Sequence, residues 1–194
     1  MLVVQKDFID VTNMTEVAPI ESHTELTCFG NEQSHLNKLV LAPSPVDGEW
    51  LPKSVVFVLV DLMVVLLGRP KGLFKECTKR IQSGMHTIQD KLLKLGITDG
   101  VGEVNLQPFA IWMAGIYLMM LMQFLENKVA VDLTRSEFMG AQEALMLMKD
   151  WFIRFPTILQ AWESAIEVLR GQYSHSLGFY KEAAFHFIEA EKVY

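Results

Sequence analysis

Three prolines divide most of the chain into segments that share one plan. Pro52, Pro108 and Pro156 each stand just before a long apolar stretch. Proline is tolerated in the first turn of a helix because the N–H group that it lacks would have no helical partner there. Each apolar stretch is followed by a turn and then by a more amphipathic stretch with helical spacing. This near-repeat predicts three helical hairpins, at about residues 53–95, 109–152 and 157–193.

Strand signals are sparse. Apart from VVFVLV at 55–60 there is no run of β-branched residues, and no Asn-Gly or Asp-Gly turn with alternating flanks. Apolar residues make up 51% of the 194 residues and charged residues 21%, as in a packed helical protein. We therefore expect an all-α fold over residues 49–194. Residues 1–48 carry no sustained period and end in a stretch rich in Pro and Gly, so we expect a disordered leader or linker there.

The last hairpin carries a stripe of alternating small and large residues. Alanines at 183 and 190 alternate with rings at 180 and 187, which suits two antiparallel helices that approach closely at the alanines. Together with two glycines, this spacing matches the tetratricopeptide (TPR) repeat at Gly171, Gly178, Tyr180, Ala183, Phe187 and Ala190. Glu167 and Ser174 stand where that motif prefers large aromatic residues, so the hairpin is a degenerate copy of the repeat.

The second hairpin repeats part of this pattern. Phe138, Ala141 and Leu145 stand at the equivalent offsets of its second helix. We expect its turn at 126–132, longer than a TPR turn, followed by a capping box from Thr134 to Glu137. The pattern favours a TPR-like α-α superhelix of three hairpins, with an unrelated helical bundle as the alternative.

The chain shows no catalytic or metal-binding motif. Its five histidines have no ligand spacing such as HExxH, and the glycine-containing loop at 96–102 lacks the lysine of a phosphate-binding loop. Cys28 and Cys77 form no metal or redox motif, and we expect free thiols. We therefore expect neither an enzyme nor a cofactor. The apolar stretches at 54–68 and 109–125 are short for membrane spans, and we expect buried helices.

The formal net charge of −6 argues against a general nucleic-acid binder. Basic residues are nevertheless concentrated in one segment, between residues 68 and 95. A solvated helix face is the ordinary explanation of such a run, and contact with an acidic partner segment or with phosphate is the alternative. The candidate contact residues are Arg69, Lys71, Lys75, Lys79 and Arg80.

Three stretches together carry a resemblance to a known family. They are LAPSPVDGEWLPKSVVFVLVDLMVVLLGRPKGLFKECTKRIQSG at 41–84, ENKVAVDLTRSEF at 126–138 and RFPTILQAWESAIEVLRGQYSHSLGFYKEAAFHFIEA at 154–190. From about Lys38 onward the chain resembles the plant form of the TPR subunit of the cohesin loader, the sister chromatid cohesion protein of the MAU family. The chain is far shorter than members of that family, so we expect it to be a partial chain.

The resemblance implies a non-catalytic scaffold. Family members form a superhelical TPR array that binds the N-terminal segment of the large HEAT-repeat loader subunit, of the Nipped-B type, and the two together load cohesin onto chromatin in the nucleus. The implied partners are thus that large subunit and, indirectly, cohesin and chromatin, with no membrane and no direct DNA contact; a cytoplasmic pool is the alternative location. The alternative function is a free-standing TPR adaptor that grips a short peptide of another partner.

Overall fold

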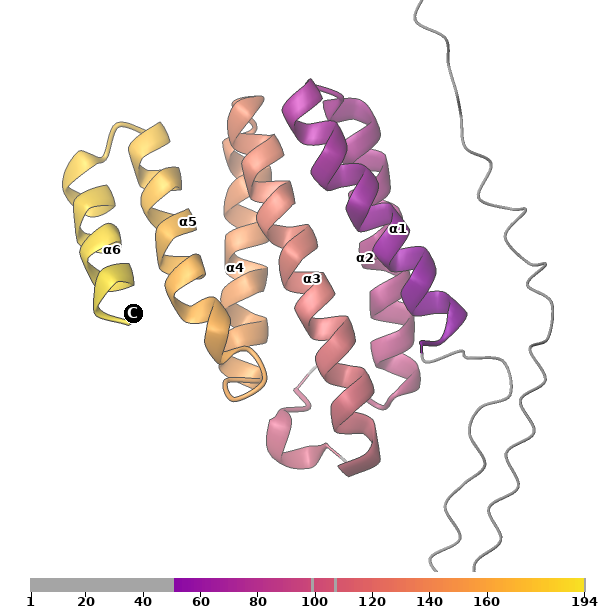
Figure 1. Cartoon of the computed structure of the whole chain (residues 1–194). Coiled ribbons are helices and arrows are strands. Elements are labelled where there is room, and N and C mark those ends of the chain that lie inside the picture. Colours follow the sequence, from indigo (N-terminus) through magenta and orange to yellow (C-terminus); the bar gives the residue numbers. More distant parts are fainter. Residues whose placement is uncertain (1–50, 99, 107, 194) are drawn as a thin grey trace, which may run out of the picture. The chain divides into compact units, whose positions relative to one another are not determined.

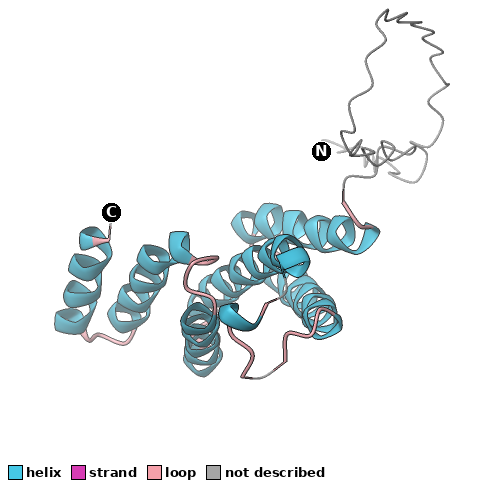
Figure 2. Cartoon of the chain, turned by 90° about the horizontal axis from the view of Figure 1, so that it is seen from below, coloured by secondary structure: helices cyan, strands magenta, loops and turns pink. Residues whose placement is uncertain are grey.

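The computed structural model describes residues 51–98, 100–106 and 108–193. In this part of the chain all regular structure is helical, which confirms the all-α prediction (Figure 2). The predicted leader, residues 1–48, lies outside the described residues. The α-helices are α1 (Lys53–Gly68), α2 (Phe74–Lys94), α3 (Pro108–Thr134), α4 (Phe138–Arg154), α5 (Glu163–Ser176) and α6 (Tyr180–Lys192).

These helices pair as antiparallel hairpins in chain order, α1 with α2, α3 with α4 and α5 with α6 (Figure 1). In that view α1 and α3 lie in front of α2 and α4. We call the surface formed by the first helices α1, α3 and α5 the A face, and the surface formed by α2 and α4 the B face. Each hairpin packs on the next, because α2 contacts α3 and α4 contacts α5.

The core is densest around α3, which has neighbours on several sides. Its central residues are fully buried, among them Leu118, Leu121 and Phe124. The ring of Phe124 lies against Gly84 of α2, where a Cβ atom would come within 2.4 Å of it. A glycine at this point lets α2 and α3 approach closely. Burial on several sides explains why the sequence of α3 is apolar almost all round.

The turns of the three hairpins share one backbone geometry. The residue two positions before each second helix has a positive φ, at Gly72 (73°), Ser136 (60°) and Gly178 (81°). The N–H group of the next residue then donates to the carbonyl five positions earlier, the arrangement of a Schellman motif. These bonds are Leu73 to Gly68 (3.1 Å), Glu137 to Asp132 (2.8 Å) and Phe179 to Ser174 (2.9 Å).

The second turn corrects the sequence-based expectation. The predicted turn at 126–132 is wrong, because α3 continues to Thr134 and only three residues separate it from α4. The predicted capping box is also wrong. The hydroxyl of Thr134 donates to the carbonyl of Ala130 at 2.7 Å, one turn back in its own helix, and α4 has no side-chain cap. A threonine hydroxyl can bond to the carbonyl one turn back in its own helix as readily as it can cap the start of the next helix.

The start of the third hairpin also differs from the expectation. The helix predicted from residue 157 begins at Glu163, after a turn and a short 3-10 helix at Gln160–Trp162. Phe155, Leu159 and Trp162 are all buried in this segment. Phe155 stands before Pro156 and has φ −131° and ψ 58°, outside the helical region that a following proline disfavours, so the chain turns here before α5 begins.

The loop between the first two hairpins is pinned to the end of α4. The guanidinium of Arg154 donates to the carbonyl of Val101 at 3.1 and 3.0 Å and to that of Thr98 at 2.5 Å. It also lies over the ring of Trp151, 4.4 Å from the ring centre. Ile97 of the same loop is buried in the core. These contacts tie the loop to a residue more than fifty positions away in the sequence.

Candidate interaction surfaces

The residues of the TPR-like stripe lie along the contact between α5 and α6. Ala183 and Ala190 are buried, and the Ser164 hydroxyl of α5 donates to the carbonyl of Ala190 at 3.1 Å. The ring of Phe187 lies against Gly171, where a Cβ atom would come within 2.5 Å of it. The two remaining residues are at the turn. Gly178 has the positive φ, and Tyr180 is largely exposed, with its ring edge-on to that of His175.

The two departures from the motif are occupied by polar contacts. Glu167 lies 2.7 Å from Nδ1 of His186 on α6 and accepts a hydrogen bond from Arg170 at 2.9 Å. Ser174 is buried. A hydrogen-bonded link between α5 and α6 therefore stands where the motif has large aromatic residues. Only the pairing of α5 with α6 brings Glu167 and His186 together, so their spacing in the sequence gave no signal for this contact.

The structure divides the predicted basic face into three parts. Arg69 lines a groove on the A face. Lys71, Lys75 and Lys79 are exposed at the end of the first hairpin. Arg80 is held between two carboxylates, with Nε 2.8 Å from Glu76 and Nη1 3.0 Å from Asp61 on α1.

The charge of Arg80 is thus matched within the chain. Its hydrogen bonds to Glu76 and then to Asp61 raise the pKa of the guanidinium further above its ordinary value. Because both partners are exposed or only partly covered, these ion pairs contribute little to stability. Three lysines remain as the basic surface that is open to a partner: Lys71, Lys75 and Lys79.

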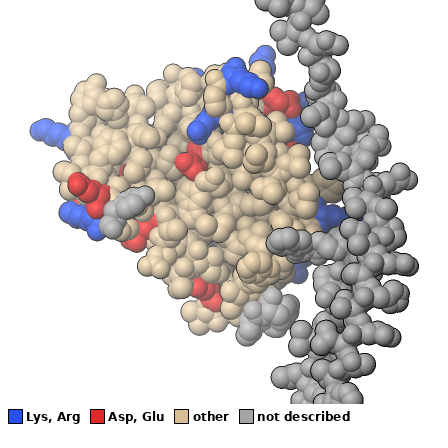
Figure 3. Space-filling model, in the orientation of Figure 1, with Lys and Arg blue, Asp and Glu red and all other residues tan. Residues whose placement is uncertain are grey.

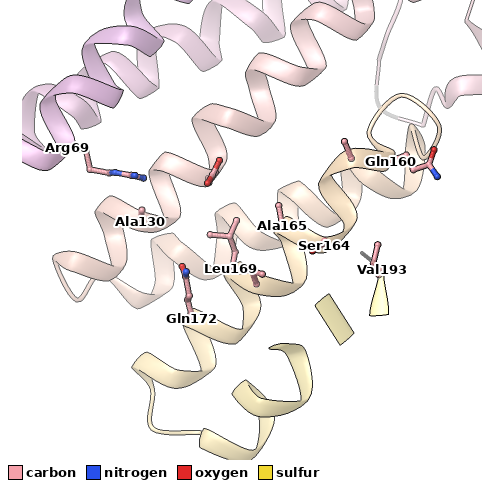
Figure 4. A pocket seen from close by; sticks show the side chains of 11 residues that line it. Arg69, Ala130, Gln160, Ser164, Ala165, Leu169, Gln172 and Val193 are labelled. Carbon is pink, nitrogen blue, oxygen red and sulfur yellow. The ribbon is translucent and has the colours of Figure 1, made fainter. Parts of the chain in front are cut away.

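A groove of about 730 Å³ crosses the A face (Figure 4). Arg69 reaches into it from the end of α1, Ala130 lies on α3, and Ala165, Leu169 and Gln172 lie along α5. The groove joins segments that are about a hundred residues apart in the sequence, so only the stacking of the hairpins brings them together. The sequence analysis did not identify this groove.

The chemistry of the groove is that of a surface for a polypeptide backbone. Small residues form its floor, and small side chains let a bound main chain approach closely. The amide side chains of Gln160 and Gln172 can both donate to and accept from peptide groups. Two charged residues, Arg69 and Glu126, also line the groove. Most of the visible surface in Figure 3 is neither basic nor acidic. The small floor residues of the groove are Ala130, Ala161, Ser164 and Ala165.

Two other kinds of feature are absent from the described residues. These residues contain no group of three or more His, Cys, Asp or Glu side chains that could hold a metal ion. None of their helices combines the length and hydropathy needed to cross a bilayer. Cys77 was expected to be a free thiol. It is buried and forms no disulfide bond, and its burial raises the pKa of the thiol.

Comparison with known proteins gives one informative relative. The chain is 64% identical over 166 residues to the sister chromatid cohesion protein SCC4 of Arabidopsis thaliana. The match covers 85% of this chain but only 23% of the relative, so the chain spans less than a quarter of that protein. No protein-family model matches the chain, and no solved structure matches it.

Identity at this level over most of the chain confirms the resemblance noted from the sequence. Over the matched residues, the chain belongs to the family of the sister chromatid cohesion protein SCC4.

Proposed function

We propose that the chain is a non-catalytic scaffold that acts in sister chromatid cohesion as part of the TPR-type subunit of the cohesin-loading complex. The relative that is 64% identical is named for sister chromatid cohesion, which supports this role. Stacked helical hairpins are typical of proteins that present extended surfaces to other proteins. The role places the chain in the nucleus, at chromatin.

The partner in this proposal is the N-terminal segment of the large HEAT-repeat loader subunit, of the Nipped-B type. The observation that carries the proposal is the A-face groove of about 730 Å³. Its floor of small residues leaves room for an extended chain, and Gln160 and Gln172 offer hydrogen bonds to its peptide groups. Cohesin and chromatin are then reached indirectly, through the large subunit.

The exposed lysines are a second contact in this proposal. Lys71 follows Arg69, the groove residue at the end of α1, by two positions, and Lys75 and Lys79 lie in the first two turns of α2. An acidic stretch of the bound segment would pair with them as it leaves the groove. Reversing the charge of Lys75 and Lys79 then slows association and lowers the affinity more at low salt than at high salt. A face that is only solvated would tolerate the same change with no loss of affinity.

The main test is a calorimetric titration of the chain with the N-terminal segment of the large subunit. Ala161→Trp places a large ring in the groove, and Ala184→Trp makes the same change at an exposed position of α6 outside it. We expect at least a tenfold loss of affinity, about 1.4 kcal/mol, for Ala161→Trp and an unchanged affinity for Ala184→Trp.

Two results would count against the proposal. Equal weakening by both substitutions would show that the groove is not the contact. If the segment does not bind the unsubstituted chain at all, the loader role fails for this chain, and the adaptor that grips another partner's peptide becomes the better hypothesis.

A further inference from the structure

A second groove lies on the B face, between α2 and α4. It has a volume of about 700 Å³. Leu92, Ile97 and Trp151 form an apolar floor that is almost completely buried, and Leu93 lies at the rim with more than half of its side chain exposed. The helices α2 and α4 lie behind α1 and α3 in Figure 1, and no residue lines both this groove and the one on the A face.

A smaller cavity of about 240 Å³ adjoins this groove. The two share His86 and Gln89 of α2, and the smaller one continues along α2 as far as Thr78. From Thr78 to Leu93 the helix rises by about 22 Å at 1.5 Å per residue. The B-face groove, as we call the two together, is therefore long enough for about four turns of a helix.

The outer surface of α4 carries an apolar row beside this groove. Met139, Met146 and Ile153 are spaced seven residues apart, and their exposed fractions are 70%, 65% and 65%. Seven-residue spacing places the three side chains on one line along α4, which is the pattern of a helix that packs beside another helix. Exposed methionines are also common where a surface adapts to a bound helix. No other part of the described chain covers this row.

The open charges at the groove are negative. Asp90 of α2 and Asp150 of α4 stand on its opposite walls, with side chains 44% and 63% exposed. Asp90 is paired with Lys94, but an exposed pair of this kind is weak and exchanges readily for another partner. The one lining arginine, Arg154, donates to the carbonyls of Thr98 and Val101 and lies 3.8 Å from Asp150, a contact of the same weak, exposed kind. Lys128 of α3, which lines the smaller cavity, is paired with Asp132 at 2.6 Å.

We infer that the B-face groove binds an amphipathic helix of a protein partner, with one apolar stripe and flanking Lys or Arg residues. The apolar stripe covers Leu93, Met146 and Ile153, and the basic residues pair with Asp90 and Asp150. This contact is distinct from the A-face groove and does not rest on the proposed function. It would leave the A face free, so that one chain can hold two partners at once.

The test uses two synthetic helices of about four turns with leucine at i, i+3, i+4 and i+7 spacing. One carries lysine at the remaining positions and the other carries glutamate. Fluorescence anisotropy with the full chain measures both affinities at the same salt concentration. The lysine helix should bind at least ten times more tightly than the glutamate helix.

Matched variants locate the binding, because a basic peptide is attracted to any chain with a net charge of −6. Met146→Lys with Ile153→Lys alters the row on α4, and Phe185→Lys with Ile188→Lys makes the same change in charge at exposed residues of α6. We expect the first pair to lower the affinity for the lysine helix at least tenfold more than the second pair. Circular dichroism checks that both variants remain folded.

Methyl signals of the methionines give a second readout in the unsubstituted chain. Binding of the lysine helix should shift the signals of Met85, which lines the smaller cavity, and Met146. The signal of Met63 on α1 should stay in place. Equal losses in the two variant pairs, shifts confined to α1, or no binding of the lysine helix would each overturn the inference.

Discussion

Ser136 and Gly178 occupy the same left-handed position in two turns, with φ of 60° and 81°. The left-handed conformation costs a residue with a Cβ atom about 1 kcal/mol, whereas glycine adopts it without that steric cost. Ser136→Gly should therefore raise the free energy of unfolding by up to about 1 kcal/mol, and Gly178→Ser should lower it by about 1 kcal/mol. Urea denaturation followed by circular dichroism measures both changes.

Ser83→Gly is the matched control, since Ser83 is exposed in the interior of α2 and has no positive φ. There glycine should destabilise the chain by about 0.5–1 kcal/mol. Stabilisation by both serine-to-glycine changes, or by neither, would show that the left-handed turn does not set the difference.

Ala183 tests whether the TPR-like stripe is a contact between helices. It is 2% exposed on α6, whereas Lys181 on the same helix is exposed. Ala183→Trp should destabilise the chain by about 1–3 kcal/mol because it overpacks the contact with α5, and Lys181→Trp by no more than about 0.5 kcal/mol. Thermal unfolding gives the melting temperature of each variant. Equal decreases in melting temperature would mean that the stripe is not a contact between helices and does not support the TPR assignment.

At the level of elements, the pinned loop between α2 and α3 depends on Arg154. Replacing Arg154 by Leu removes the donor to the carbonyls of Thr98 and Val101 and should cost about 0.5–1.5 kcal/mol, since water can reach these exposed and part-buried carbonyls. Hydrogen exchange should speed up across the loop and at Ile97, while α6 keeps its protection. Asp150→Asn is the control, because Asp150 lies 3.8 Å from Arg154 and makes no contact with the loop that the structure records. Unchanged exchange in the loop would contradict this role of Arg154.

The number and order of the helices could be predicted from the sequence. The helical spacing of apolar residues and the prolines before each hairpin are local features that the sequence shows directly. The turn of the second hairpin could not, since Ser136 carries no turn signal and Thr134 can serve equally as a cap or as a helix residue. The two grooves could not be predicted either. Arg69 and Gln160 come to line one groove only after the three hairpins have stacked. The sequence also does not show that the row on α4 is exposed.

At the scale of the whole molecule, α1 leaves much of its surface open. Val60 and Leu67 are 52% and 62% exposed and lie seven residues apart on one side of the helix. Apolar surface of this kind favours association. We predict that the chain self-associates in a concentration-dependent way, and that Val60→Glu with Leu67→Glu makes it monomeric. Size-exclusion chromatography with light scattering measures the mass of each.

Phe185→Glu with Ile188→Glu, the matched change on α6, should leave the association in place. A chain that is already monomeric at high concentration would contradict the prediction. So would equal effects of the two variant pairs, because association would then not depend on α1.

The central claim is that the A-face groove holds the N-terminal segment of the large loader subunit, and site-specific photo-cross-linking tests it most directly. A benzophenone side chain replaces Gln172 in the groove or, as the control, Ala184 on the exposed side of α6. After irradiation with the purified large subunit, mass spectrometry identifies the cross-linked peptides. We predict cross-links from position 172 to the N-terminal segment and none from position 184. Cross-links from position 184 alone, or none from either position, would contradict the claim.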